Sequence, residues 1–292
     1  MNVAVVATAA SIAVLGAFTL APASASAQEV SVRHAVARMV VIVEDRTDIA
    51  VEIENGSANL PRPIVTRRGN DVRIDGDLGR NPTRECTRSN AVARQPGQGA
   101  TVEVRRRGRV SLADAPLILV RTPRKVEVNI EDSAVYGAVG RGASSIELGN
   151  AGCGDWTVAN TTGELELSVA GSGAVWAGTS RAVEVSLAGS GDISVGATRD
   201  LTVNIAGSGD ITAARVDGPV EANIAGSGNV LVRGGNAGHV EANIAGSGDV
   251  RIEAAASTVE ASIMGSGDVH VRSVSGRIDQ SAMGSGRVIV GR

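Results

Sequence analysis

The short segment Ala-Gly-Ser-Gly-Asp, with its variants, recurs through the second half of this 292-residue sequence and constrains the fold more than any other feature. A repeat close to 20 residues indicates stacked supersecondary units, because a single unit of this size cannot bury its apolar face alone. The serines between the paired glycines are separated by 18, 18, 19, 20, 19 and 19 residues and lie at Ser172, Ser190, Ser208, Ser227, Ser247, Ser266 and Ser285. We therefore expect a solenoid.

Each repeat unit reads as two short strands that meet at the Gly-Ser-Gly corner. In one copy, side-chain alternation places Val240 and Ile244 on one face and Glu241 and Asn243 on the other. Glycine suits the corner because the chain turns there and the backbones of adjacent coils come close. The sequence predicts an all-β protein, with a parallel β-helix or β-solenoid of about 19-residue two-strand coils over residues 126–292.

Residues 28–125 read as a β-rich N-terminal region that continues into the solenoid or caps it. Residues 76–99 contain two prolines, four glycines and many polar residues, which is typical of a long surface excursion. Residues 64–67 and 72–74 flank a turn and predict a hairpin. Other strand-like runs cover residues 38–44, 49–53, 101–104 and 117–120.

The first 27 residues have the pattern of an export signal. An apolar run spans residues 3–20, and Ala25-Ser26-Ala27 supplies the small residues of a cleavage site. A retained membrane anchor is the alternative, because the run approaches the length that spans a bilayer. Without a second long apolar run, we expect an exported chain with no transmembrane segment, located in the periplasm, at the outer membrane or outside the cell.

Charge is distributed unevenly along the chain. Residues 62–125 carry 15 basic and 6 acidic groups, whereas residues 126–292 carry 10 basic and 19 acidic groups. Such polarity could guide self-association into a homo-oligomer or attraction to anionic surfaces, but a solvated arginine-rich surface is the simpler interpretation. Nucleic acid is not an expected partner, because no aromatic residues alternate with these arginines.

Cys86 and Cys153 are the only two cysteines of the sequence. In an oxidising compartment two such cysteines often pair, and this disulfide would attach the N-terminal region to the repeats. A reactive thiol or a metal ligand is the other interpretation. It is weakly supported, because neither residue belongs to a Cys-x-x-Cys motif or has a neighbouring histidine.

Three pieces of the sequence together resemble a known bacterial family. They are residues 32–36, residues 121–128 and the Gly-Ser-Gly-Asp copies. The chain is similar to the proteins described as "putative auto-transporter adhesin, head GIN domain". The resemblance implies an adhesin-like, β-helical extracytoplasmic protein of poorly defined function, and it supplies no catalytic residues.

A column of aspartates is the feature that could bind a metal. Asp192, Asp210, Asp249 and Asp268, with Asn229 between them, follow the corner glycines and should stack. Closely spaced carboxylates can recruit a cation such as calcium. The calcium-binding nonapeptide repeat, however, needs Gly-Gly-x-Gly-x-Asp at a spacing of nine residues, and solvated turn aspartates are the simpler interpretation.

Other residues could contact a ligand. Trp176 lies on an outward strand position where it could stack on a sugar ring, or it could pack beneath the excursion. His270, four residues after Ser266, also points outward, but seven equivalent serines favour structural repetition over a tuned nucleophile. Outward Asn204, Asn223 and Asn243 continue into Ser262 and Ser281 as a polar row.

The sequence therefore predicts a non-enzymatic envelope or surface protein without a cofactor. Its most plausible role is an adhesin-like binding module that contacts glycans or surface proteins through the solenoid faces. A structural scaffold that self-associates through an open solenoid end is the alternative. A polysaccharide-active enzyme is a third interpretation, because β-helices host such enzymes, but the repeat shows no clustered carboxylate pair suited to glycoside hydrolysis.

Overall fold

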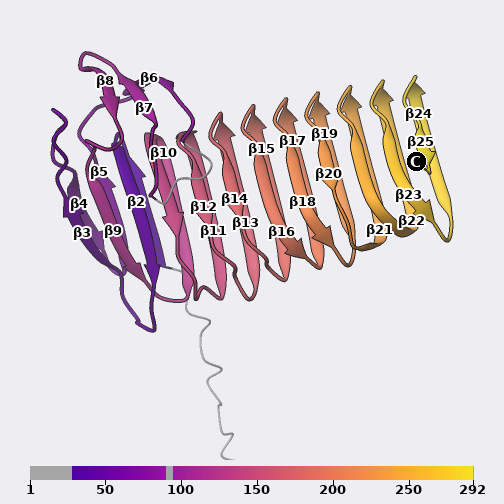
Figure 1. The fold of residues 1–292 in the computed structure, drawn as a ribbon, viewed down its shortest axis with the longest axis horizontal. Helices are drawn as coiled ribbons and strands as arrows, with labels where there is room; N and C mark the ends of the chain where they lie inside the picture. The colour runs from indigo at the N-terminus through magenta and orange to yellow at the C-terminus, as the bar shows by residue number, and fades with distance from the viewer. Residues whose placement is uncertain (1–27, 90–94, 292) are drawn as a thin grey trace, which may run out of the picture.

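The structure is a computed structural model that describes residues 28–89 and 95–291. The predicted export signal at residues 1–27 lies outside these residues. The described chain contains strands and no helix, and most of the strands wind into an elongated solenoid (Figure 1). The predicted all-β solenoid is thus confirmed.

The first side of the solenoid is a long parallel sheet in which each coil contributes one strand. The long strands β10 and β22 bend and belong to both sides: β10 runs from the first side to the second, and β22 from the second to the first. In spatial order, the strands of the first side are β5 (Asp71–Asp75), β1 (Gln28–Arg33), β10 (Lys125–Val139), β11 (Ser145–Cys153), β13 (Glu164–Gly171), β15 (Ala182–Gly189), β17 (Asp200–Gly207), β19 (Val220–Gly226), β21 (Asn236–Gly246), β22 (Val250–Gly265) and β24 (Ile278–Gly284).

The second side is also parallel and is built mostly from shorter strands. Together with β10 and β22, these are β9 (Leu117–Thr122), β2 (Val36–Val43), β12 (Trp156–Val158), β14 (Val175–Ala177), β16 (Ile193–Thr198), β18 (Ile211–Val216), β20 (Val230–Val232), β23 (Val269–Val274) and β25 (Val288–Val290). The two sides enclose one continuous apolar core.

The core follows the alternation of the sequence. Val203 lies in register with Ala222 on the next coil, and Ala222 lies in register with Ala242, so each inward position stacks on its own equivalents. All three side chains are fully buried. Trp156, the largest buried side chain, occupies an inward position in register with Val175. One row of branched or small aliphatic side chains per strand is sufficient to fill this thin core.

The Gly-Ser-Gly corner needs its two glycines for different reasons. Gly226, the first of its corner, has a φ of 135°, which L-residues rarely adopt. A Cβ on Gly228, the second, would lie 2.3 Å from the carbonyl oxygen of Gly209 on the preceding coil. The Gly207 carbonyl also accepts hydrogen bonds from the backbone N–H groups of Ser227 and Gly228. The corners therefore form part of the ladder between coils.

The predicted N-terminal region and the repeats share one sheet. Strand β10 pairs with β1 and β2 on one side and with β11 and β12 on the other. The next rung toward the N-terminal end is made of β5 and β9, which the chain reaches only after leaving the solenoid at β2. Antiparallel strands then cover this rung. They are β4 (Ile64–Arg68), which forms the predicted hairpin with β5, and β3 (Ala50–Glu54), which pairs with β9.

The described part of the predicted surface excursion, residues 76–89 and 95–99, includes regular structure. It contributes β6 (Thr83–Cys86) to a small antiparallel sheet with β7 (Thr101–Val104) and β8 (Gly108–Ser111). This sheet buries a second apolar cluster against the solenoid, around Leu112 and Tyr136. The strand predicted at residues 101–104 corresponds to β7, whereas β6 and β8 were not predicted from the sequence.

Covalent and polar contacts fix the small sheet to the solenoid. Cys86 and Cys153 form a disulfide with their Cα atoms 6.2 Å apart. Asp155, a buried carboxylate, accepts hydrogen bonds from the backbone and the hydroxyl of Ser89 and from the backbone of Ala174. The Tyr136 hydroxyl donates to the Thr87 carbonyl at 2.6 Å. Burial, reinforced by the nearby Asp155 charge, raises the pKa of Tyr136, so the phenol stays protonated and donates.

Candidate functional site

The outward face of the first side, which we call the groove face, carries three columns of equivalent side chains. The register of the strands aligns them along the solenoid axis. The carboxylate column is Asp71, Glu29, Glu127, Glu147, Glu166, Glu184, Thr202, Glu221, Glu241, Glu260 and Asp279. The polar column runs from Asn129 through Gly149, Ser168, Ser186, Asn204, Asn223, Asn243 and Ser262 to Ser281. The alanine column is Ala151, Ala170, Ala188, Ala206, Ala225, Ala245, Met264 and Met283.

A long shallow groove lies over the polar and alanine columns. It has a volume of about 870 Å³ and extends from Asn129 to Ser281. Eight rung steps of roughly 4.8 Å make it about 38 Å long. Every side chain of the alanine column is exposed, and Met264 and Met283 reach 56% and 69% exposure. The groove is therefore an apolar stripe bordered by polar groups, which is the composition of a binding surface.

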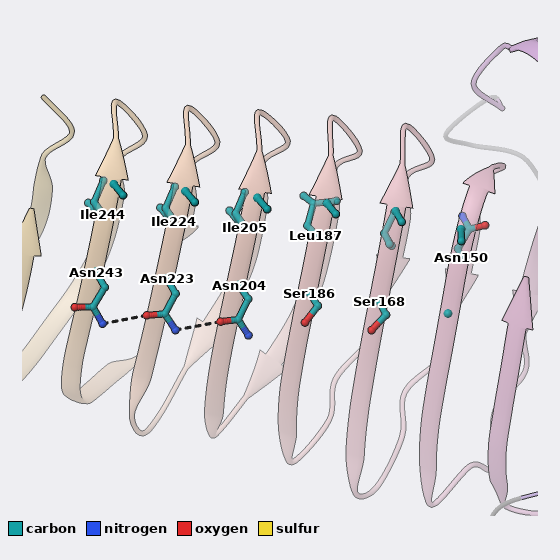
Figure 2. A pocket seen from close by; sticks show the side chains of 18 of the residues that line it. Asn150, Ser168, Ser186, Leu187, Asn204, Ile205, Asn223, Ile224, Asn243 and Ile244 are labelled. Carbon is teal, nitrogen blue, oxygen red and sulfur yellow. Dashed lines mark hydrogen bonds between the residues drawn. The ribbon is translucent and has the colours of Figure 1, made fainter. Parts of the chain in front are cut away.

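The asparagines of the polar column form an amide ladder (Figure 2). Asn243 Nδ2 donates to Asn223 Oδ1 at 3.0 Å, and Asn223 Nδ2 donates to Asn204 Oδ1 at 3.1 Å. The same amides donate sideways to the carboxylate column, from Asn223 to Glu221 and from Asn243 to Glu241. The predicted polar row is thus present, and it links the groove to the row of carboxylates beside it.

The glutamates of the carboxylate column are not neutralised by the protein. Among the ion pairs of residues 28–89 and 95–291, none involves these side chains, whereas Asp279 pairs with Arg277. Burial raises the pKa of Glu127 and of Glu166, and like-charged neighbours on adjacent rungs, led by Glu147, add to both shifts. The column is therefore a row of mutually repelling negative charges.

The predicted aspartate column lies at the corners, away from the groove, and has a structural partner at each step. Asp249 Oδ1 accepts the backbone N–H of Asp268 on the next coil at 2.8 Å, and Asp268 Oδ1 accepts that of Arg287. Asn229 plays the same role toward Asp249 through its amide oxygen. Asp192 also forms an ion pair with Arg88. These carboxylates cap the strand that follows in the neighbouring coil, as N-cap residues do in helices.

The structure does not bring Trp176 and His270 together. Both lie outward on the second side, in one column but five rungs apart, or about 24 Å. Both are half-buried. His270 Nε2 lies 4.0 Å from Asp268 and borders a small hollow with Arg251. Trp176 lies in register with Thr157 and Ser194 on the neighbouring rungs. Neither residue borders the groove.

No nucleophile with a positioned base is found among the corner serines of the described chain. Ser247 Oγ donates to Ser227 Oγ at 3.4 Å, but no corner serine hydrogen-bonds to a histidine. In the same residues, no group of three or more acidic, histidine or cysteine side chains is arranged to hold a metal ion. Over residues 28–89 and 95–291, no helix has the length and hydropathy needed to cross a membrane.

The carboxylate column is the feature that sequence reasoning missed. Its signal is present, because glutamate stands five residues before the first corner glycine in most copies, for example Glu221 before Gly226 and Glu241 before Gly246. Only the strand register shows that Glu29, from the start of the described chain, belongs to the same row.

Fold and face together define an extended β-solenoid whose first side presents ordered columns of equivalent outward side chains. The chain belongs to the family described as "putative auto-transporter adhesin, head GIN domain", whose profile matches residues 28–215 and 213–291. This membership confirms the resemblance seen in the sequence.

Two solved structures are similar to the chain over most of its length. One is described as a "putative adhesin" from Bacteroides fragilis NCTC 9343, with 15% identity and a TM-score of 0.38 over 90% of this chain and 91% of that one. The other is described as a "putative lipid binding protein" from Parabacteroides distasonis ATCC 8503, with 16% identity and a TM-score of 0.40 over 91% and 93%. No curated protein matches the chain.

Proposed function

We propose that this protein is a non-enzymatic, adhesin-like binding module of the cell envelope or surface, and that its groove face binds a linear glycan. The observation that supports the proposal is the continuous groove over the polar and alanine columns. Its family membership points the same way.

The two columns of the groove suit the two kinds of surface that a sugar chain presents. Amides and hydroxyls such as Asn223 and Ser262 can exchange hydrogen bonds with ring hydroxyls. The methyl groups of Ala206 and Ala225 offer a flat apolar surface to the C–H face of a ring. Because both columns repeat at every rung, a chain that runs along the solenoid axis meets the same environment many times, and weak contacts add up.

Filling the groove tests the proposal. Ala206→Trp places a large side chain on the exposed alanine column, whereas Ala214→Trp makes the same change at an exposed position of the second side. On a glycan array, we expect Ala206→Trp to abolish binding and Ala214→Trp to leave it intact. Loss of binding in Ala214→Trp or Trp176→Ala, but not in Ala206→Trp, would move the site to the second side.

A scaffold that self-associates end to end is the second candidate, and the C-terminal coil favours it. Among the described strands, β24 and β25 have a neighbour on one side only. Ile278, Met283 and Val290 of this coil are 42%, 69% and 46% exposed. An uncovered parallel edge of this kind favours pairing with another strand. A mass that rises with concentration, in a protein that binds no glycan, would support the scaffold over the binding module.

A further inference from the structure

The groove is bordered along its length by negative charge. The carboxylate column lies beside the polar column, two residues earlier on each strand, and the amides of Asn223 and Asn243 hydrogen-bond to its glutamates. From Glu29 to Glu260 the column covers eight rung steps, or about 38 Å, which is the length of the groove itself.

The eight glutamates of this row form no ion pair within the described protein. Arg181 nearby pairs with Glu164 instead. Carboxylates stacked one rung apart repel, and this repulsion adds to partial burial, the main cause of the raised pKa values of Glu127 and Glu166. A ligand that supplies one positive charge per rung would relieve the repulsion.

We propose that the occupant of the groove face is a linear polymer of amino sugars with free, protonated amines. The inference rests on the proposed glycan-binding function and specifies the class of glycan. Sugar rings lie over the alanine and polar columns, and the ammonium groups on the side that faces the carboxylate column pair with its glutamates.

Other polymers fit this face less well. An anionic polymer meets a row of like charge. A neutral glycan leaves the glutamates partly desolvated without a partner. A basic peptide in extended form presents side chains of one face every 6.6–6.8 Å, whereas the rungs repeat at about 4.8 Å, so the two lose register within a few rungs. A second copy of this chain, placed face to face, would bring two carboxylate columns together.

The test compares three hexamers of related backbone by calorimetry: glucosamine, N-acetylglucosamine and glucose, all β-1,4-linked. We expect the glucosamine hexamer to bind most tightly, and its affinity to fall as salt is added. The double variant Glu221→Gln/Glu241→Gln should weaken this binding by about tenfold, because each exposed ion pair contributes modestly. The matched double variant Glu52→Gln/Glu54→Gln, on β3 and far from the groove, should bind like the wild type. Thermal unfolding monitors the fold of both variants.

The other possible results show whether the amino-sugar inference fails alone or together with the glycan-binding function on which it rests. Equal binding of all three hexamers, unaffected by Glu221→Gln/Glu241→Gln, would overturn the amino-sugar inference and retain the glycan-binding function. Binding of none would overturn both. Equal losses in the two double variants, or equally tight binding of hexalysine, would show that general attraction between charges, and not the groove, selects the ligand.

Discussion

Asp249 should stabilise the solenoid by capping the next coil, and Asp249→Ala tests this role. Its Oδ1 accepts the backbone N–H of Asp268 at 2.8 Å. A hydrogen bond to a charged acceptor contributes about 1.5–3 kcal/mol, and the lower end applies here because Asp249 is exposed and water can replace it. Losses at helix caps are similar. We therefore expect Asp249→Ala to lower the free energy of unfolding by about 1.5 kcal/mol.

The chain offers a matched control at the same position of another coil. The amide oxygen of Asn229 accepts the backbone N–H of Asp249 at 2.9 Å, so an asparagine can cap the next coil. Asp249→Asn should therefore lower the free energy of unfolding by less than about 0.5 kcal/mol. Equilibrium urea unfolding measures both variants, and the m-value shows whether the transition is unchanged. An asparagine variant as unstable as the alanine variant would refute the capping argument. A calcium-dependent rise in Tm that the wild type shows and Asp249→Ala loses would assign the column to metal binding.

Three further perturbations test other parts of the structure. Gly207→Ala should lower the free energy of unfolding by about 3 kcal/mol, because φ is 144° and the new Cβ would lie 2.2 Å from the Gly189 carbonyl oxygen. The neighbouring control Ser208→Ala should leave this free energy nearly unchanged in the same urea titration. The Cys86–Cys153 disulfide joins residues 67 positions apart, so its reduction should lower the free energy of unfolding by about 4 kcal/mol. An unchanged Tm in reductant would contradict this. Glu166→Gln should stabilise the protein near neutral pH.

The sign of the Glu166 effect follows from its pKa. Burial, Glu147 and Glu184 raise the pKa in the folded state above its unfolded value, so ionisation costs stability as pH rises through the ordinary glutamate range. The advantage of glutamine should therefore be full at neutral pH and absent below about pH 4. Unfolding midpoints measured across this range check it, and a glutamine variant that is less stable at pH 7 would contradict the electrostatic origin.

The repeat half of the fold can be predicted from the sequence because its period and its alternation agree. Residues such as Ile224 and Asn223 fall on opposite faces at every copy, and glycine marks each corner. Nothing local shows that β10 pairs with β1, almost 100 residues earlier, because that contact depends on where the chain returns after its excursion. The same reason hides the covering strands β3 and β4.

The candidate site was only partly predictable. The polar row was evident from Asn204, Asn223 and Asn243, because each lies at the same place in its copy. Trp176 and His270 attract attention in the sequence as rare residue types, yet the groove consists of common residues such as alanine. The groove arises from repetition across coils, and no single residue forms it.

Alanine-methyl NMR during titration with a glycan hexamer tests most directly whether the groove face is the binding surface. If the groove face binds the hexamer, we predict chemical-shift changes confined to the methyl groups of the alanine column, such as those of Ala206, Ala225 and Ala245. Buried Ala222 and exposed Ala214, on the second side, serve as internal references. Chemical-shift changes centred on Ala214 would contradict binding in the groove. So would a ligand that binds and leaves the methyl resonances of the alanine column unchanged.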